Sequence, residues 1–204
     1  MNLNFALLLK HVILCLACIG GDKLGEFVQK PALLRACIDN ATHALIGCIV
    51  SVIVLNSGKI HVTKQDYWMF LFEATIVSSC IDLDHFIEAR SFSLKDATHL
   101  DHRPFLHNSA LCLFILGLLF AIIRFDGSVK LRLFIAMAFV AFSTHHIRDA
   151  TRRGIWIKTP IFNKSSPALP YVAYIAFVNF VPHAIIYLLQ VATPASKTKF
   201  VELV

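Results

Sequence analysis

Long apolar runs separated by short polar stretches repeat along most of the chain. An α-helix needs about 20 mostly apolar residues to cross the hydrocarbon core, and somewhat shorter runs can cross where they pack against neighbouring helices. The polar stretches between the runs are too short to divide the chain. The pattern therefore predicts an all-α, polytopic membrane helix bundle with about five to six transmembrane helices, as a single multi-pass domain over residues 1–204. The expected helices cover residues 3–20, 40–56, 67–82, 104–123, 131–147 and 169–192.

Ionisable side chains gather at the ends of the apolar runs between residues 80 and 150. Near the hydrocarbon, such a side chain is unfavourable unless it pairs, binds an ion or lines a wet cavity, so it indicates a functional site by default. The sequence therefore predicts a site at the ends of these helices. The residues concerned are Asp82, Asp84, His85, His107, His145, His146 and Asp149.

Alternate loops of a six-helix bundle lie on the same face of the membrane. With the expected helices, the loops 21–39, 83–103 and 148–168 share one face, and every residue of this group lies in or beside them. Asp39 and His43 lie at the start of the second expected helix, on that face too. Structural polar residues would be scattered over both faces, so the convergence predicts a single site.

The spacing of the candidate residues supports a shared site. Asp39 and His43 are four positions apart, as are His145 and Asp149, so each pair projects from one side of its helix. A carboxylate beside an imidazole either binds a metal ion directly or orients the histidine that binds it. The spacing leaves both roles open.

A mixed set of imidazoles and carboxylates favours a divalent metal ion, zinc or manganese above all, over calcium or a thiolate site. A metal ion that activates water and polarises a phosphoryl or carbonyl oxygen catalyses hydrolysis. Arg148, Arg152 and Arg153 follow the fifth expected helix, where their guanidinium groups could hold a phosphate group. The candidate metal ligands are His43, Asp82, Asp84, His85, His107, His145, His146 and Asp149.

Simpler roles are open for several of these residues. His107 lies at an expected helix start, where it could satisfy a loop carbonyl. His145 and His146 are adjacent and point in different directions around a helix, so we expect at most one of them to face the site. Asp149 could form an ordinary ion pair with Arg148, and short loops carry arginine for topology alone.

Composition excludes a soluble domain, because 57% of the 204 residues are hydrophobic and only 16% are charged. The net charge of +6 is spread over short loops without the interleaved aromatic residues of an RNA-binding surface. We therefore expect the lipid bilayer, and no nucleic acid, as the partner of this charge. The six cysteines lie in or beside apolar runs, which argues against a disulfide framework.

Two strings of the sequence carry a family resemblance. The first contains Asp82-Leu83-Asp84-His85 and then His102-Arg103-Pro104-Phe105-Leu106-His107-Asn108-Ser109, and the second contains Ser143-Thr144-His145-His146-Ile147-Arg148-Asp149, followed by Arg152-Arg153-Gly154-Ile155-Trp156. These strings resemble the animal transmembrane protein 267 family, and the resemblance extends from about Asp39 to His183. That family is in turn similar, mainly in these motifs, to bacterial inner-membrane proteins described as predicted metal-dependent hydrolases of the LexA-regulated type.

The bacterial pattern implies a site that adds His102 to the candidate metal ligands and includes Arg103 and Ser109. This chain has Pro104 where the bacterial pattern has glycine and Leu106 where it has threonine, so the loop differs while the implied ligands are kept. Carried over by position, the pattern falls on Asp82, Asp84, His85, His102, Arg103, His107, Ser109, Asp149 and either His146 or His145. We expect catalytic roles for Asp84, Arg103 and Arg148.

The polar group and the resemblance together favour a membrane-bound metal-dependent hydrolase of a lipid-like or phosphate ester substrate. The alternative is a non-catalytic integral membrane protein whose polar centre holds helices together or binds a partner. A transporter would need polar residues that continue through the membrane, and that path is thin in this sequence.

The loops of the site face carry more lysine and arginine than the loops of the other face, which favours a cytosolic site. Asn163-Lys164-Ser165 is a glycosylation sequon on the same face, so a glycan there would place the site in the lumen instead. We expect the protein in an intracellular membrane such as the endoplasmic reticulum.

Overall fold

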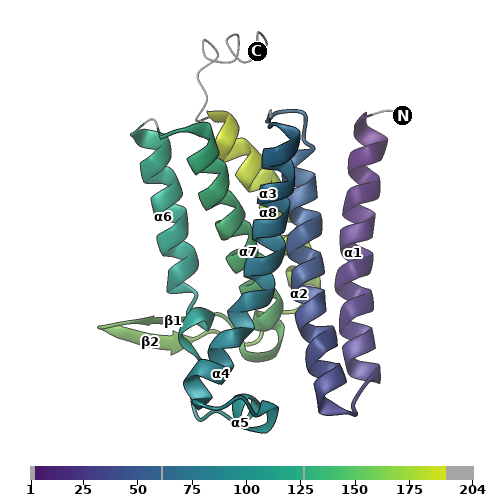
Figure 1. The fold of residues 1–204 in the computed structure, drawn as a ribbon, viewed down its shortest axis with the longest axis vertical. Coiled ribbons are helices and arrows are strands. Elements are labelled where there is room, and N and C mark those ends of the chain that lie inside the picture. The colour runs from purple at the N-terminus through teal and green to yellow at the C-terminus, as the bar shows by residue number, and fades with distance from the viewer. Residues whose placement is uncertain (1–2, 61, 126, 192–204) are drawn as a thin grey trace.

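Six long helices stand side by side in the part of the chain that the structure, a computed structural model, describes: residues 3–60, 62–125 and 127–191 (Figure 1). Each long helix coincides with one of the expected apolar segments. The helices are α1 (Leu3–Phe27), α2 (Ala32–Leu55), α3 (Lys64–Cys80), α6 (Ala110–Arg124), α7 (Val129–Arg153) and α8 (Tyr171–Val191).

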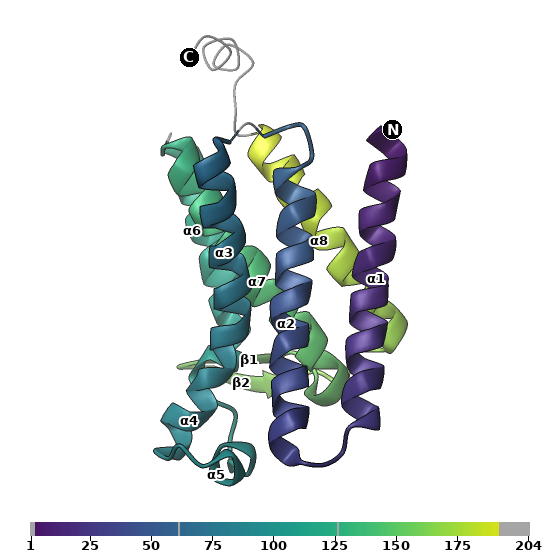
Figure 2. The same cartoon turned by 45° about the vertical axis from the view of Figure 1, so that its right-hand side comes forward.

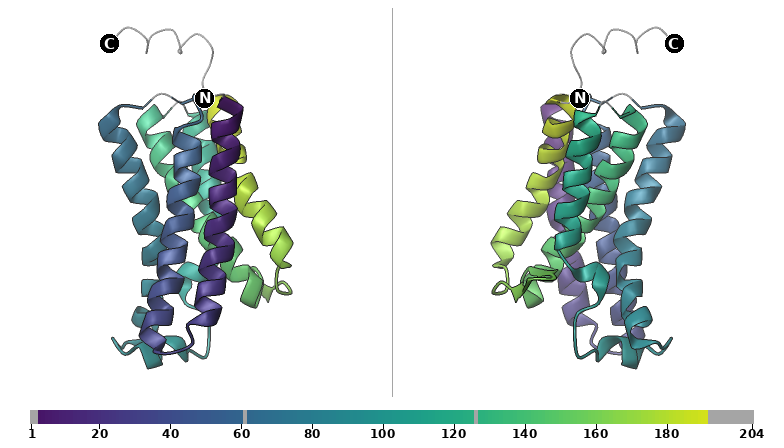
Figure 3. Two further views of the ribbon diagram at one scale, coloured as in Figure 1. Left: turned by 90° about the vertical axis from the view of Figure 1, so that its right-hand side faces the viewer. Right: turned by 90° about the vertical axis from the view of Figure 1, so that its left-hand side faces the viewer.

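Short elements gather at one end of the bundle, which we call the site end (Figures 1 and 2). The start of α1 and the finish of α8 both lie at the opposite end, and α8 is inclined to the other helices (Figure 3). Between α3 and α6 come η1 (Ile81–Leu83), α4 (Asp84–Ala89), α5 (Leu94–Thr98) and η2 (Phe105–His107), while β1 (Trp156–Thr159) and β2 (Phe162–Ser165) follow α7 as an antiparallel hairpin.

Among the helices that the structure describes, α1, α2 and α8 are long and apolar enough to cross a membrane. Helix α6 is apolar but has only 15 residues. Apolar side chains are exposed on the outer surface of the bundle, including Leu16, Phe72, Phe114 and Phe180, as expected where a protein meets lipid. The predicted helical membrane architecture is therefore confirmed, but the expected all-α fold also contains the β1–β2 hairpin, and the count of five to six transmembrane helices stays a prediction.

Several helices are longer at the site end than the apolar pattern predicts. Helix α1 continues to Phe27, α2 begins at Ala32 and α7 continues to Arg153. Hydropathy marks only the part of a helix inside the hydrocarbon, whereas its backbone hydrogen bonds continue into the headgroup region. Asp39 and Asp149 consequently lie within helices, where their directions are fixed, and the predicted loops that contained them were too long.

The expected helix over residues 104–123 begins later than predicted, at Ala110. Residues Phe105–His107 form a 3-10 turn, and Asn108 is extended with φ −79° and ψ 110°. Pro104, which precedes this turn, has an extended backbone, so the long helix that the apolar residues predicted does not begin there. His107 therefore lies on a loop instead of a helix.

The hairpin, which the sequence pattern did not predict, fixes this loop. The side chain of Asn108 accepts a hydrogen bond from the Lys158 N–H at 2.9 Å and donates one to the Lys158 carbonyl at 2.8 Å. The N–H of Ser109 donates to the carbonyl of Trp156 at 2.8 Å. Strand β1 thus determines where the segment with His107 lies.

Helix α7 packs against α2, α3, α6 and α8, so it forms the centre of the bundle. Its residues Ala136 and Val140 are fully buried. Helices α2 and α3 approach closely, because Gly47 faces Ser78 and Ala74 and a β-carbon at this glycine would overlap the Ser78 hydroxyl. Small residues allow such close packing between membrane helices.

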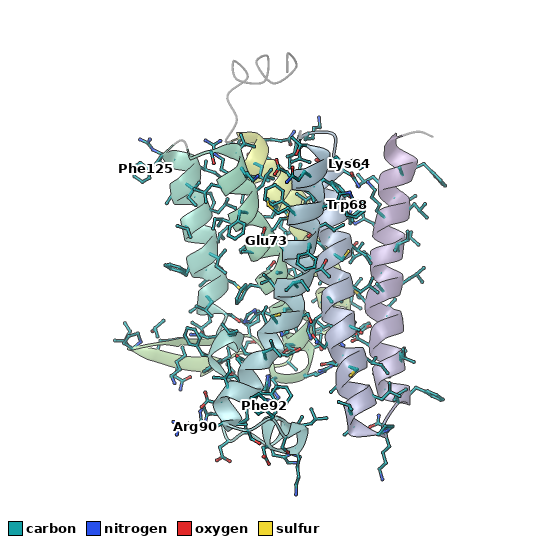
Figure 4. The ribbon with its side chains drawn as sticks, in the orientation of Figure 1. Lys64, Trp68, Glu73, Arg90, Phe92 and Phe125 are labelled. Carbon is teal, nitrogen blue, oxygen red and sulfur yellow. The ribbon has the colours of Figure 1, made fainter. Side chains whose placement is uncertain are left out.

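Side chains at the two ends frame the apolar belt (Figure 4). Lys64 and Phe125 lie at the end opposite the site, with Trp68 on the next turn of α3. Arg90 and Phe92 lie at the site end, and Phe92 is fully exposed. Aromatic and basic residues in these positions are typical of the two membrane–water interfaces.

Candidate metal centre

Four side chains from three separate segments direct their donor atoms at one point. Asp82 comes from η1, His107 from η2, and His145 and Asp149 from α7, and their ligand atoms all lie within 4.8 Å of one another. We call these residues the four-residue cluster. The turn η1, which follows α3, and the turn η2, which precedes α6, bring Asp82 and His107 next to α7.

The spacing of these donor atoms is regular. His107 Nε2 lies 3.3 Å from Asp82 Oδ1 and 3.3 Å from Asp149 Oδ2. His145 Nε2 lies 3.5 Å from each of the same two oxygens. The two Nε2 atoms are 3.3 Å apart.

This spacing fits a tetrahedral divalent ion. Ligands at about 2.0–2.1 Å from a tetrahedral zinc ion lie about 3.3–3.4 Å from one another. These five separations, from 3.3 to 3.5 Å, match the edges of such a tetrahedron. Two imidazoles and two carboxylates are also a donor set that zinc and manganese accept.

The second ring nitrogen of each histidine is held by a neighbour. His107 Nδ1 lies 3.2 Å from Asp84, and His145 Nδ1 lies 3.0 Å from the backbone carbonyl of Ser78. A carbonyl only accepts, so His145 Nδ1 carries the proton and donates it, which leaves Nε2 as the metal-binding nitrogen. Outer partners of this kind orient metal-binding histidines in general.

Asp84 orients His107 from outside the four-residue cluster. It is 5% exposed, and its Oδ2 accepts a hydrogen bond from the Leu106 N–H at 2.7 Å. Burial would raise the pKa of Asp84, but hydrogen bonds from His107 and His85 lower it to about 2. The carboxylate is therefore ionised at neutral pH and holds the Nδ1–H of His107.

The cluster creates a strongly negative potential at His107. Burial would lower the pKa of this histidine, but the carboxylates of Asp149, Asp82 and Asp84 raise it to about 11. Without a cation, the ring consequently carries a second proton. A metal ion at the point where the donors converge would replace the Nε2 proton and balance the same carboxylates.

A cavity of about 150 Å³ opens beside the cluster. Asp82, His107 and Asp149 line it, so three of the four candidate ligands can be reached from the cavity. His145 lies behind them and is 1% exposed. The other wall includes His85, Arg103, Ser109, Arg152, Arg153 and Trp156.

Arg148 does not line this cavity, although the sequence predicted a catalytic role for it. It is 1% exposed, and its Nε and Nη2 donate to Asp22 at 2.9 Å and to Asp39 at 2.7 Å. Asp39 also accepts a hydrogen bond from Arg152 at 2.5 Å. The two carboxylates compensate the buried guanidinium, so Arg148 connects α7 to α1 and α2.

Two predicted ligands lie apart from the four-residue cluster. His102 is exposed, and its Nε2 lies 2.6 Å from the Glu88 carboxylate. His146 lines the cavity, but its Nδ1 donates to the carbonyl of Phe142 at 2.7 Å on its own helix. Of the adjacent histidines, His145 faces the cluster, in agreement with the expectation that only one would do so.

His85 and His43 are in contact with the cluster without belonging to it. His85 Nδ1 lies 3.2 Å from Asp84 Oδ1, and the ring lines the cavity. His43 is buried and stacks on His145, with ring centroids 3.8 Å apart. The predicted ligands thus form an inner group of four and an adjoining group of three around it.

Two guanidinium groups of the cavity, those of Arg103 and Arg153, form no ion pair with a carboxylate among the described residues. Arg103 donates hydrogen bonds to the backbone carbonyls of Arg153 and Gly154. Arg153 also lines the cavity and has no ion-pair partner among the described residues. A phosphate group is the kind of ligand that such guanidinium groups bind.

The predicted set of ligands omits Asp39, which also lines the cavity. Its position four residues before His43 was the available signal, because both then lie on one side of α2. Asp22 gave no comparable signal. Its contact with Arg148 joins residues 126 positions apart, which only the fold brings together.

Comparison with known proteins identifies relatives over most of the chain. Transmembrane protein 267 of Bos taurus is 36% identical over 179 residues, which cover 86% of this chain and 80% of the relative. The Danio rerio protein of the same name is 37% identical over 161 residues, 77% of this chain and 68% of the relative. The Mus musculus protein is 35% identical over 185 residues, 89% and 82% respectively. No protein-family model and no solved structure matches the chain.

Proposed function

Because this chain belongs to the transmembrane protein 267 family and contains a buried His/Asp cluster, we propose that it is a membrane-embedded metal-dependent hydrolase. The substrate in this proposal is a phosphate ester of a lipid or lipid-like molecule. The observation that carries the proposal is the tetrahedral spacing of four donor atoms beside an open cavity. The resemblance to bacterial predicted hydrolases that the sequence motifs suggest leads to the same class of reaction.

Asp82, His107, His145 and Asp149 would hold a zinc or manganese ion. Such an ion, when bound, lowers the pKa of a water ligand and polarises a phosphoryl oxygen. Asp84 keeps the His107 ring in the orientation that presents Nε2 to the ion, so its role is positioning.

The arginines of the cavity are suited to hold the phosphate. Arg103 is fixed by two backbone carbonyls and can present its remaining N–H groups to an anion. Arg153 offers a second guanidinium without a competing carboxylate among the described residues. Arg148, which is buried against Asp22 and Asp39, stabilises the frame of the site in this proposal.

The proposed location of the site follows from the architecture. All six long helices would cross the bilayer, which puts the cluster near the headgroups at the site end. Such a position suits a substrate whose acyl chains stay in the membrane while its phosphate enters the cavity. We place the protein in an intracellular membrane such as the endoplasmic reticulum, with the site towards the cytosol.

One observation favours a second candidate function. A metal ion with four protein ligands resembles a structural zinc site, because catalytic sites usually leave one position open. In that case the ion would join η1, η2 and α7 without any reaction. The cavity beside three of the four ligands favours the hydrolase.

The first experiment measures metal content by elemental mass spectrometry of the full chain purified in detergent without chelators. We expect stoichiometric zinc or manganese in the wild type and its loss in His107→Ala, with His99→Ala as the matched control on an exposed loop. Removal of the metal with a chelator should lower the unfolding temperature, and reloading should restore it.

The second measurement is phosphate release from p-nitrophenyl phosphate and from a short-chain phosphatidic acid. Metal-dependent release that is lost in Arg153→Ala, while the metal stays bound, supports the hydrolase. Bound metal without any release favours the structural role. Absence of metal after reloading with zinc and manganese would contradict both.

A further inference from the structure

We infer that the site holds two metal ions, the second bound by His43 and Asp39, with Asp149 shared between the two. This inference deepens the proposed function, because it rests on the four-residue cluster as the first position. Its evidence starts from His43 and Asp39, which lie outside that cluster and face its members Asp149 and His145.

His43 is a buried imidazole without a hydrogen bond. It is 2% exposed, and neither ring nitrogen has a hydrogen-bond partner in the part of the chain that the structure describes. An unsatisfied buried polar group is unfavourable and calls for a ligand. His43 Nε2 faces Asp149 Oδ1 at 3.4 Å and Asp39 Oδ2 at 4.0 Å.

The two oxygens of the Asp149 carboxylate face the two proposed metal positions. Its Oδ2 faces the Nε2 atoms of His107 and His145 at 3.3 and 3.5 Å. Its Oδ1 faces His43 at 3.4 Å, again close to the separation of two ligands on one ion. A carboxylate in this arrangement can bridge two metal ions.

The stacking of His43 on His145 sets the distance between the two positions. Their ring centroids are 3.8 Å apart, and the ring planes differ by only 20°. Metal ions bound in the planes of stacked rings would be separated by a similar distance. Two-metal hydrolytic sites keep their ions about 3.5–4 Å apart.

Asp39 has an oxygen within reach of the second ion. Its Oδ1 accepts hydrogen bonds from Arg148 at 2.7 Å and Arg152 at 2.5 Å, whereas Oδ2 accepts one hydrogen bond among the described residues, from Arg152 at 3.2 Å. Two ligands on opposite sides of one ion, each at about 2.0–2.2 Å from it, are about 4.0–4.4 Å apart. The 4.0 Å between Asp39 Oδ2 and His43 Nε2 lies within this range.

The second position is more open than the first. Asp39, His43 and Asp82 offer ligand atoms within 4.8 Å of one another, and Asp39, Asp82 and Asp149 all line the cavity. An ion there would have fewer protein ligands and a free side towards the arginines. It would supply the open coordination position that a closed four-ligand site lacks.

Manganese content and electron paramagnetic resonance of the full chain in detergent test this inference. The wild type, loaded with Mn²⁺ alone, should bind two equivalents and give the multiline spectrum of two coupled ions. His43→Ala should bind one equivalent and give an uncoupled six-line signal. His183→Ala, in which an exposed histidine of α8 loses its 3.0 Å contact with His11, is the matched control and should keep both ions.

The wild-type spectrum tests the two-metal inference even where a variant fails to fold. One equivalent with an uncoupled signal in the wild type overturns the two-metal inference and leaves the single-metal hydrolase intact. Two equivalents in His43→Ala with an unchanged coupled spectrum overturn the assignment of His43. No bound manganese in any sample overturns the inference together with the metal centre on which it rests.

Discussion

The imidazole of His107 is held between carboxylates on both of its nitrogens. Asp84 contacts Nδ1 at 3.2 Å, while Asp82 and Asp149 contact Nε2 at 3.3 Å each. The ring therefore has a defined orientation before any ion binds. Such pre-orientation raises metal affinity, because little side-chain freedom is lost on binding.

Asp84→Asn should weaken metal binding without removing a metal ligand. The amide can still accept the Leu106 hydrogen bond, but it holds the His107 Nδ1–H less strongly than a carboxylate does. We expect affinity to fall by about 10–100-fold, as for other outer partners of metal-binding histidines. Competition titration with a zinc indicator measures the change.

Asp96→Asn is the control for this substitution, because Asp96 is an exposed carboxylate of the same end that bonds to Ser91 at 2.6 Å. Equal affinity in Asp84→Asn, Asp96→Asn and the wild type would contradict the positioning role of Asp84.

Arg148→Met should destabilise the fold more than it affects the cavity. The substitution leaves Asp22 and Asp39 without the guanidinium that they share. Loss of one partner from a buried ion pair costs about 3–5 kcal/mol, because the remaining charges are uncompensated. Thermal unfolding in detergent, compared with Arg35→Met on an exposed part of α2, measures the loss. Wild-type stability together with lost phosphate release would instead support a direct catalytic role for Arg148.

The contact between helices α2 and α3 leaves no space for a larger side chain at Gly47. Gly47 lies against Ser78, and the carbonyl of Ser78 in turn holds His145. A larger residue at position 47 would therefore move the helix that orients a metal ligand. The packing of α2 on α3 therefore connects the membrane interior with the site.

Gly47→Leu should reduce stability and metal content together. Overpacking of a close contact typically costs about 1–3 kcal/mol, and the shift of α3 should disturb the His145–Ser78 hydrogen bond. Gly117→Leu on α6 is the matched control, because a β-carbon there meets no atom within 4 Å. Unfolding temperature and bound zinc are the measurements. Equal results for the two variants would show that the α2–α3 contact tolerates the added volume.

The extents of the helices could be predicted only in part. Apolar runs identified all six long helices, but α7 continues through His146 and Asp149 to Arg153, beyond its apolar run. The sequence spacing of His145 and Asp149 correctly indicated a shared side of that helix, because helical geometry is local. The hairpin was missed, since strands of only four residues leave little pattern in the sequence, and β2 is exposed along its whole length.

At the scale of the whole molecule, an even number of membrane crossings would leave the start of the first helix and the finish of the last helix on the same side of the membrane. The start of α1 and the finish of α8 do both lie at the end opposite the site (Figure 3). Asn163 lies in β2 at the site end, exposed to solvent. The glycosylation state of this residue therefore reports the orientation of the site.

We expect Asn163 to remain unglycosylated and a sequon appended after Val204 to be glycosylated in cells. We expect the basic residues of the site-end loops to orient that end towards the cytosol, where no glycan is added. Sensitivity of the electrophoretic mobility to a glycosidase measures both sites. A glycan on Asn163 that Asn163→Gln removes would reverse the orientation and put the site in the lumen.

The sequence by itself determined the membrane character, the six long helices and the polar residues from which the site is built. These features depend on local hydrophobicity and helical period, which are written in neighbouring residues. Only the tertiary structure decided which of the candidates share a point in space. It separated His145 from His146, excluded His102 from the cluster, and buried Arg148 between Asp22 and Asp39. The Arg148 contacts join residues 126 and 109 positions apart and the His107–His145 contact joins residues 38 positions apart, so they depend on how the helices pack and not on any local pattern.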